Sequence, residues 1–144
     1  MSESPSGPPS SADSAESLDS AILRLLMENL PDRIYFKDLQ SRFVRVNRAH
    51  ATWLGVTTPE DVLGKTDFDF FSQAHAQGAF TEEQVIIYTG RPLIGEVQRI
   101  TKRDGTEAWG STTKMPWRDD TGRIIGTFGV TRNVTATKQA EDKL

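Results

Sequence analysis

The 144-residue sequence predicts an α+β fold, in which one antiparallel sheet carries short helices on one face. Apolar and polar residues alternate with a period of two in two blocks, 33–47 and 92–134. A block of helical patterns, 48–90, separates them. Strands split around a helical block, and joined within each block by turns, favour a single antiparallel sheet.

Before the first strand, residues 1–14 are rich in Ser, Pro and Gly and predict a disordered tail. Residues 15–30 predict a helix, because Leu18, Ile22 and Leu25 recur at helical spacing and a proline follows. This apolar stripe needs a partner. Two alternatives remain, the helix's own domain and the matching helix of a second copy.

The first hairpin is predicted in RIYFKDLQSRFVRVN, where two alternating runs flank the turn DLQS. RAHATWLG and TPEDVLG predict short helices, and FTEEQVIIYTG predicts a helix that ends near Gly90. In the last third, PLIGEVQRITK and TEAWGSTTKMPW flank an Asp-Gly turn signal, and RIIGTFGVTRNV follows DDTG. These three runs predict an antiparallel meander, after which TATKQAEDKL predicts a polar helix.

Composition limits the partners. The net charge of −3 offers no basic surface for nucleic acid, and no apolar run approaches the length of a membrane span. Absence of cysteine excludes a thiol nucleophile and a thiol–flavin adduct and fits a reducing compartment, so a cytoplasmic location is expected. The residues contain no nucleophile elbow, P-loop or dinucleotide fingerprint, so no catalytic residue and no enzyme activity are predicted.

Taken in order, several segments resemble the sensory PAS domains found before histidine kinases and diguanylate cyclases. The segments are LPDRIYFKD with RFVRVNRAHATWLG, then PEDVLGKTDFDFF, and finally DGTEAWGSTTKMPWRDDTGRIIGTFGVTRNVT. The resemblance implies a sheet of five strands in the order 2-1-5-4-3. It places the PAS domain at 31–135 and the start of an outgoing signalling helix at 136–144. It also implies a pocket between sheet and helices that holds a small ligand in some members.

Two positions depart from the family pattern. Ser41 stands where a glycine is usual in the first hairpin turn, and Asn133 stands where an Asp-x-Thr pattern is usual at the end of the sheet. Asparagine keeps its hydrogen bonds but cannot form an ion pair. Asn133 and Thr135 are therefore the expected relay between the sheet and the outgoing helix, without the usual salt bridge.

Alternation along the strands predicts which side chains would line a ligand pocket, since one face of the sheet must point at the helices. The predicted lining residues are Phe36, Val46, Trp53, Ile86, Trp109, Thr113, Met115 and Phe128. Core packing without a ligand is the alternative interpretation of the aromatic residues among them.

The stretch GKTDFDFFSQAHAQ places Asp67 and Asp69 close to His75. We expect helix capping and core packing rather than a metal or acid–base site, because further oxygen ligands and a glycine turn are missing. His75 lies one turn before the position, near Ala79, at which some PAS domains bind haem. With His50 as the only other histidine, no metal site is predicted, and neither haem nor flavin is expected as a cofactor.

These features predict a sensory module that binds a small ligand or a partner, forms a homodimer and passes a conformational change to an output domain beyond residue 144. The output would be a histidine kinase or a diguanylate cyclase. Leu18, Ile22 and Leu25 are the expected dimer contacts. The alternative is a ligand-free interaction or dimerisation module, and a haem-based gas or redox sensor is a third interpretation.

Overall fold

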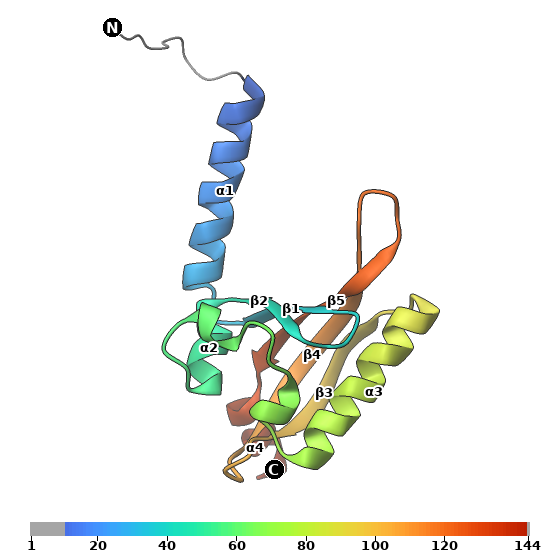
Figure 1. Cartoon of the computed structure of the whole chain (residues 1–144). Helices are drawn as coiled ribbons and strands as arrows, with labels where there is room; N and C mark the ends of the chain where they lie inside the picture. The colour runs from blue at the N-terminus through green and yellow to red at the C-terminus, as the bar shows by residue number, and fades with distance from the viewer. Residues whose placement is uncertain (1–10, 144) are drawn as a thin grey trace, which may run out of the picture.

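The computed structural model describes residues 11–143, with side chains from Ser17 onward, and its centre is one five-stranded antiparallel sheet. The strand order is β2-β1-β5-β4-β3, as expected from the sequence. Figure 1 shows α2, α3 and the short helices on one face, while α1 projects away from the sheet. The elements are α1 (Ser11–Asn29), β1 (Arg33–Asp38), β2 (Phe43–Val46), α2 (Arg48–Leu54), the 3-10 turns η1 (Pro59–Val62) and η2 (Asp67–Asp69), α3 (Gln73–Thr89), β3 (Leu93–Thr101), β4 (Glu107–Arg118), β5 (Ile124–Asn133) and α4 (Thr135–Asp142).

Local turn chemistry explains where the helices end. Gly55 and Gly90 follow α2 and α3 with φ angles of 81° and 73°, in the left-handed region that favours glycine. Ser41 has a φ of 61° in the first hairpin turn, so this serine adopts the conformation for which the family uses glycine. Its amide donates to the Asp38 carbonyl at 3.0 Å, and the turn therefore keeps its shape without a glycine.

The helix α1 begins at Ser11, so residues 11–14 of the predicted tail are helical, and the rest of that tail lies outside the described residues. Its last turn holds it to the domain through the buried Met27 and a 3.1 Å ion pair between Glu28 and Arg48. Nearer the N-terminus of the helix, Leu18 and Leu25 are 61% and 63% exposed. Most of the apolar stripe on α1 therefore has no contact partner within the described chain.

The face of the sheet that points at the helices is the polar half of the alternation. Lys37 on β1 and Lys114 on β4 are buried there, whereas their neighbour Phe36 points to the opposite, outer face. On that outer face Phe36 stacks on Phe128 and meets the edge of Trp117, with ring centroids 5.4 Å apart in both pairs. The alternation of the two strand faces was predicted correctly. The face that points at the helices was predicted wrongly for these strands, because the apolar side chains were expected to point inward.

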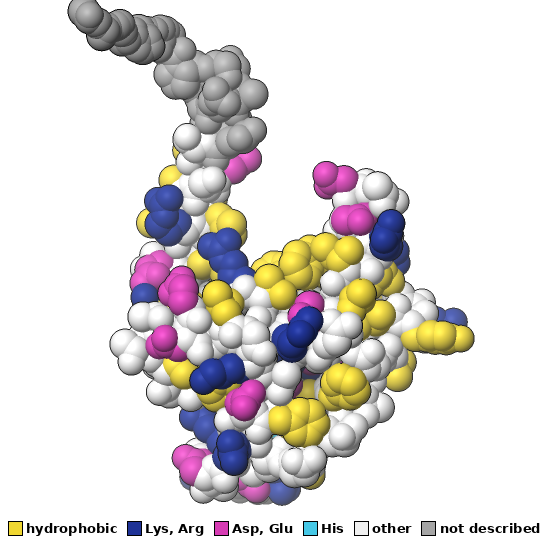
Figure 2. Space-filling model, in the orientation of Figure 1, with side chains coloured by type: hydrophobic (Ala, Val, Ile, Leu, Met, Phe, Trp, Pro, Cys, Tyr) yellow, Lys and Arg dark blue, Asp and Glu magenta, His cyan; other side chains and the backbone are white. Residues whose placement is uncertain are grey.

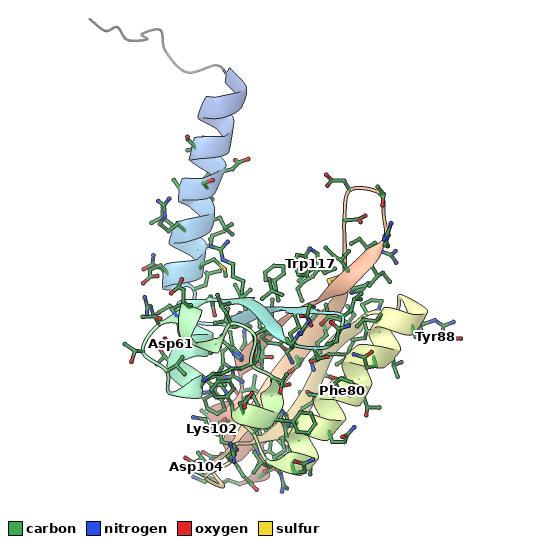
Figure 3. All side chains as sticks on the ribbon, viewed as in Figure 1. Asp61, Phe80, Tyr88, Lys102, Asp104 and Trp117 are labelled. Atoms are coloured by element: carbon green, nitrogen blue, oxygen red, sulfur yellow. The ribbon has the colours of Figure 1, made fainter. Side chains whose placement is uncertain are left out.

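The outer face continues into an exposed apolar surface. Ile94 and Val97 on the edge strand β3 are 66% and 52% exposed. Figure 2 shows hydrophobic side chains gathered between the base of α1 and the β4–β5 hairpin, and Figure 3 places Trp117 at the base of that hairpin. Between residues 11 and 143, no helix is both long and apolar enough to cross a membrane.

Candidate ligand-binding cavity

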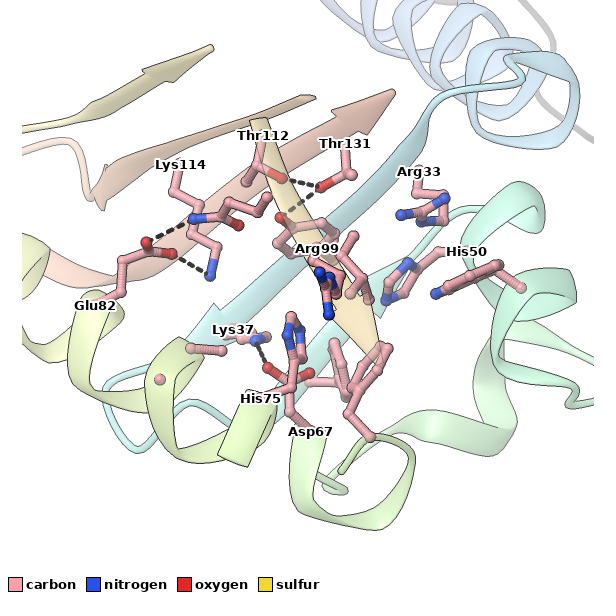
Figure 4. Close-up of a pocket in the computed structure, with 18 of the residues that line it drawn as sticks. Arg33, Lys37, His50, Asp67, His75, Glu82, Arg99, Thr112, Lys114 and Thr131 are labelled. Atoms are coloured by element: carbon pink, nitrogen blue, oxygen red, sulfur yellow. Dashed lines mark hydrogen bonds and ion pairs between the residues drawn. The ribbon is translucent and has the colours of Figure 1, made fainter. Parts of the chain in front are cut away.

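A cavity of about 320 Å³ lies between the helix-facing side of the sheet and the helices α2 and α3. The strands β1, β4 and β5 form its floor, and η2 and α3 form its opposite wall (Figure 4). Most of the residues that line it are polar or charged, and aromatic rings lie among them, which is unusual for the interior of so small a domain. Three groups of residues divide the cavity along β1: a charged cluster, a set of hydroxyl groups and a set of nitrogen donors.

The charged cluster joins four elements around Glu83 of α3. Lys37 Nζ donates to Glu83 Oε2 and to Asp67 Oδ2 of η2, both at 2.7 Å. Lys114 Nζ lies 2.8 Å from Glu83 Oε2 and 2.8 Å from Glu82 Oε1. Because the side chain of Glu83 is only 1% exposed, it bridges both ammonium groups away from water. The cluster fixes α3 against β1 and β4.

Each charged group of this cluster stabilises the ionised form of its neighbours. Burial alone would raise the pKa of Glu83, but the ammonium groups of Lys37 and Lys114 outweigh burial and lower this pKa to about 2. Burial alone would lower the pKa of both lysines, and the neighbouring carboxylates outweigh burial there too and raise it. Both lysines and Glu83 are therefore charged at neutral pH.

Hydroxyl groups occupy the middle of the cavity floor. Tyr35 Oη and Thr131 Oγ1 are 3.0 Å apart, and Thr131 Oγ1 lies 3.2 Å from Thr112 Oγ1. This chain of hydroxyls crosses from β1 through β5 to β4, because these strands are neighbours in the sheet. A hydroxyl both donates and accepts, so the middle of the cavity can pair with either kind of polar ligand atom.

Nitrogen donors line the end of the cavity nearest α2. Arg33 of β1 lies over the Trp53 ring, with Cζ 4.4 Å from the ring centroid. His50 packs between Tyr35 and Phe43, with ring centroids 5.0 and 5.6 Å away. Burial, together with the charges of Arg33 and Lys37, lowers the pKa of His50 well below its usual value, so its imidazole is neutral.

Of the predicted lining residues, Trp53 alone lines this cavity. Val46 and Ile86 are buried on the helix side, apart from the cavity. The remaining five belong to the opposite phase of the strand alternation and so lie on the outer face; they are Phe36, Trp109, Thr113, Met115 and Phe128. These five residues cannot line this cavity, because the residues before and after them in each strand are the ones that point into it.

Sequence reasoning missed the charged and hydroxyl residues of the cavity. Lys37 and Lys114 were not among the predicted lining residues, and lysine is usually found on the solvent side of a strand. A signal was nevertheless present, because lysines in the middle of two strands accompany the adjacent Glu82 and Glu83 in a helix predicted to cover the sheet. Opposite charges on facing elements can be buried together when they pair.

The two aspartates before α3, Asp67 and Asp69, have different roles. Asp69 completes a capping box at η2, as predicted, with its carboxylate 3.0 Å from the Thr66 amide nitrogen. Asp67 is instead buried in the ion pair with Lys37, which corrects the expectation of a cap at that position. His75 and His50 both line the cavity, so neither is simply a surface residue.

The lining does not fit haem. A porphyrin needs apolar walls above and below its ring, and the corresponding walls here carry Lys37, Asp67 and Glu82. Within the described residues, no group of three or more His, Cys, Asp or Glu side chains is placed to hold a metal ion. The cavity is suited to a small polar organic molecule instead.

From the cavity, the end of β5 leads directly to the C-terminal helix. Asn133 Oδ1 accepts from the Thr135 amide at 3.0 Å, and Thr135 Oγ1 accepts from the Trp109 amide at 2.9 Å. The Val134 amide donates to the Trp109 carbonyl at 2.9 Å, and Lys138 Nζ lies 5.0 Å from the Trp109 ring centroid. Thr135 thus fastens the start of α4 to β4, and the Asn133 side chain in turn bonds to Thr135.

Two relatives share this domain. The chain is 32% identical over 117 residues to the methanogenesis regulatory histidine kinase FilI of Methanothrix harundinacea, covering 81% of this chain and 13% of FilI. It is 25% identical over 121 residues to a diguanylate cyclase of Vibrio cholerae, covering 83% of this chain and 37% of the cyclase. The chain therefore spans a minor part of both relatives.

Solved structures agree with these relatives. A structure of the Vibrio cholerae VqmA dimer, described as a LuxR-type receptor, superposes with a TM-score of 0.71 at 31% identity, covering 81% of this chain and 52% of that one. A structure of VqmA bound to DPO gives 0.69 at 30% identity, covering 81% and 57%. The PAS fold family matches residues 27–139. Since this match spans most of the sequence, the chain belongs to the PAS fold family.

Proposed function

We propose that this PAS domain is the input module of a signalling protein, in which a small ligand bound in the cavity changes how α4 is held. The observation that carries the proposal is the polar cavity between sheet and helices, which contains buried donors without a partner. A domain that served only as a packing unit would fill this space with apolar side chains. The module itself has no catalytic role.

The relatives support a sensory role with differing outputs. PAS domains of this kind occur in a histidine kinase and in a diguanylate cyclase, and VqmA structures include one bound to DPO. We expect a covalently linked kinase or cyclase output domain after α4. The location in the cytoplasm is part of the same proposal, since such output domains use intracellular nucleotides.

The path from ligand to output would run along β5 and β4. Thr131 lines the cavity, and Asn133, two residues later, binds the first residue of α4. A ligand that pairs with the hydroxyl chain would shift the population between two packings of these strands. The start of α4 would then move with them, because Thr135 is bonded to the backbone of Trp109.

A homodimer would complete the module. The exposed apolar stripe of α1 and the exposed outer face of the sheet lie on the same side of the domain, separated by a hollow in Figure 2. Burying both in a dimer would remove apolar surface from water, which is the main drive for association. Leu18, Ile22 and Leu25 remain the expected contacts on α1.

The proposal is tested by native mass spectrometry and thermal unfolding with a panel of small polar molecules that includes DPO. Ligands should raise the unfolding temperature and add their mass to the folded protein. Gly78→Phe should abolish this gain, because Gly78 lines the cavity and a side chain at this position would enter open space. Thr137→Phe, on the exposed side of α4, is the matched control.

The competing function is a ligand-free interaction and dimerisation module. Its support is the apolar surface of α1 and the outer sheet face, which does not depend on the cavity. In that case Gly78→Phe would stabilise the domain and leave dimerisation unchanged, while no member of the panel shifted the wild-type unfolding temperature. That combined result would replace the sensory proposal.

A further inference from the structure

The end of the cavity nearest α2 is built from three nitrogen-bearing side chains. Arg33 comes from the start of β1, and His50 and Trp53 lie one turn apart on α2. Arg33 and His50 are only 6% and 5% exposed, yet both line the cavity. Figure 4 shows Arg33 and His50 together at this end, away from Lys114 and Glu82. The two helix residues and the arginine therefore face one small volume.

These donors have no partner in the part of the chain that the structure describes. Neither ring nitrogen of His50 forms a hydrogen bond, and the same holds for Trp53 Nε1. Arg33 takes part in no side-chain hydrogen bond or ion pair among residues 17–143, and its contact there is with the Trp53 ring. Buried polar groups are nearly always paired, so this arrangement indicates a missing partner.

The local charge is positive and only partly compensated by the neighbouring Asp32. Asp32, the carboxylate next to Arg33 in sequence, is directed to Arg132, with a separation of 3.6 Å. Lys102 lies over the Trp53 ring at 4.1 Å, so a second cation borders the same end. Lys37, by contrast, is already paired with Asp67 and Glu83. Arg33 and Lys37 are four residues apart on one strand, which separates the two ends by about 13 Å.

We propose that this end of the cavity binds the carboxylate of a small planar monocarboxylate. The proposal rests on the sensory function above and names the chemistry of its ligand. Arg33 offers the forked pair of N–H groups that matches a carboxylate, and His50 and Trp53 add single donors. A dianion such as phosphate fits less well, because Asp67 and Glu82 also line the cavity and would repel the second charge.

The walls restrict the rest of the ligand. Tyr35, Phe43, Trp53 and Phe71 place aromatic rings around a volume of about 320 Å³, which favours one flat ring. The hydroxyls of Tyr35, Thr112 and Thr131 lie beyond the carboxylate end and can bind a ring nitrogen or a ring substituent. An aromatic or heteroaromatic acid combines these features.

The test compares acids with their neutral amides of the same shape. Calorimetry with the wild-type chain would use benzoate against benzamide and nicotinate against nicotinamide. We expect each acid to bind at least about tenfold more tightly than its amide, as a charge-assisted pair with Arg33 requires. Equal affinity of acid and amide, or no binding of any of these four probes, would overturn the carboxylate inference.

Two variants locate the preference. Arg33→Met keeps much of the side-chain volume and removes the buried charge, and should erase the difference between acid and amide. Arg45→Met, at an exposed arginine on β2 outside the cavity lining, should keep it. A preference retained in Arg33→Met would place the anion elsewhere. If Arg33→Met does not fold, Trp53→Phe, which removes one donor, should weaken acid binding more than amide binding, and an unchanged ratio would count against the inference.

The experiments distinguish a failure of the carboxylate inference from a failure of the proposed sensory function. If the four probes do not bind but another member of the panel, such as DPO, stabilises the wild-type chain and not Gly78→Phe, the cavity is a sensor site for another ligand class. The carboxylate inference then falls while the proposed function stands. If the wider panel also leaves the protein unchanged, both fall.

Discussion

Glu83 accepts hydrogen bonds from two lysines that come from different strands, Lys37 and Lys114. Glu83→Gln would leave both ammonium groups buried with one fewer negative charge. We expect the free energy of unfolding to fall by about 3–5 kcal/mol, as when one partner of a buried ion pair is removed. Urea unfolding followed by tryptophan fluorescence measures this loss.

Glu82→Gln is the matched control, because Glu82 is adjacent, forms an ion pair with one lysine, Lys114, accepts a neutral hydrogen bond from Gln98 at 2.9 Å and has a side chain that is 22% exposed. Its loss should be about 1 kcal/mol, since solvent screens the pair. If the two variants lost the same stability, the buried position of Glu83 would not be what matters, and the cluster would have no special role.

The two histidines make stability depend on pH. Burial lowers the pKa of both His50 and His75, so their neutral forms favour the folded state. The stability that they contribute is present above the unfolded value near 6.5 and is lost as pH falls below it. Between about pH 7 and 5, the free energy of unfolding of the wild-type chain should fall, and His50→Gln should flatten this fall more than His75→Gln.

Thermal unfolding across that range, with both single variants, is the measurement. A pH profile that is identical in wild type and His50→Gln would contradict the burial of a neutral imidazole. Glu83 adds a second step at lower pH: its pKa is lowered from 4.5 to about 2, so its contribution is lost as pH falls from 4.5 towards the folded value. Glu83→Gln should remove that step.

The roles of individual residues in the cavity were harder to predict from the sequence than the elements or the fold. Trp53 was included among the predicted lining residues as an aromatic side chain, and Asp69 was expected to cap a helix. The charged residues were missed because the burial of Lys37 depends on Asp67 and Glu83, which are remote in sequence and meet it only after the helices cover the sheet. Alternation reveals two faces of a strand but not which one is covered.

Among the elements, α4 is attached to the sheet in part through the side chain of Thr135. Thr135→Val keeps the shape of residue 135 and removes the oxygen that accepts from the Trp109 amide. The expected loss is about 1 kcal/mol, confined to the attachment of α4. Hydrogen exchange of residues 135–142 should become faster, while exchange in the centre of β1 and β5 stays the same.

Thr137→Val is the matched control on the same helix, since Thr137 is an exposed residue of α4. If the two variants showed equal exchange in α4, Thr135 would not fasten the helix, and the relay through Asn133 and Thr135 would need another route. If exchange changed throughout the sheet, Thr135 would serve general stability instead.

The elements themselves were largely predictable. The hairpin of β1 and β2, the helix α3 ending at Gly90 and the three final strands follow from alternation, turn residues and caps, which are local properties. Pairing of β1 with β5 joins Phe36 to Phe128 across the whole domain, and no local pattern specifies it. The order of strands came from the resemblance to the PAS family.

For the whole molecule, α1 is the feature that the domain's own packing does not explain. Deleting residues 1–28 removes its exposed apolar side chains and should weaken dimerisation, because Leu18 and Leu25 are the expected contacts. Light scattering after size exclusion, at matched concentrations, measures the molar mass. A smaller change with the same direction is expected for Leu18→Ser combined with Leu25→Ser.

Tyr88→Ser is the control for these deletions and substitutions. Tyr88 is 90% exposed on α3 and points away from the domain in Figure 3, so it tests whether removing any exposed apolar residue alters the molar mass. An unchanged molar mass after deletion of residues 1–28 would contradict the role of α1 in dimerisation. The cavity proposal would be unaffected.

The three tryptophans provide the most direct test of a ligand in the cavity. Trp53 lines it with an unpaired indole N–H, whereas Trp117 lies on the outer face of the sheet against Phe36. In nitrogen-15 NMR spectra of the protein titrated with benzoate, the indole resonance of Trp53 should shift. The Trp109 signals should shift as well, because the Trp109 amide bonds to the first residue of α4. The indole resonance of Trp117 should not shift. Movement of Trp117 with Trp53 unchanged would contradict the account.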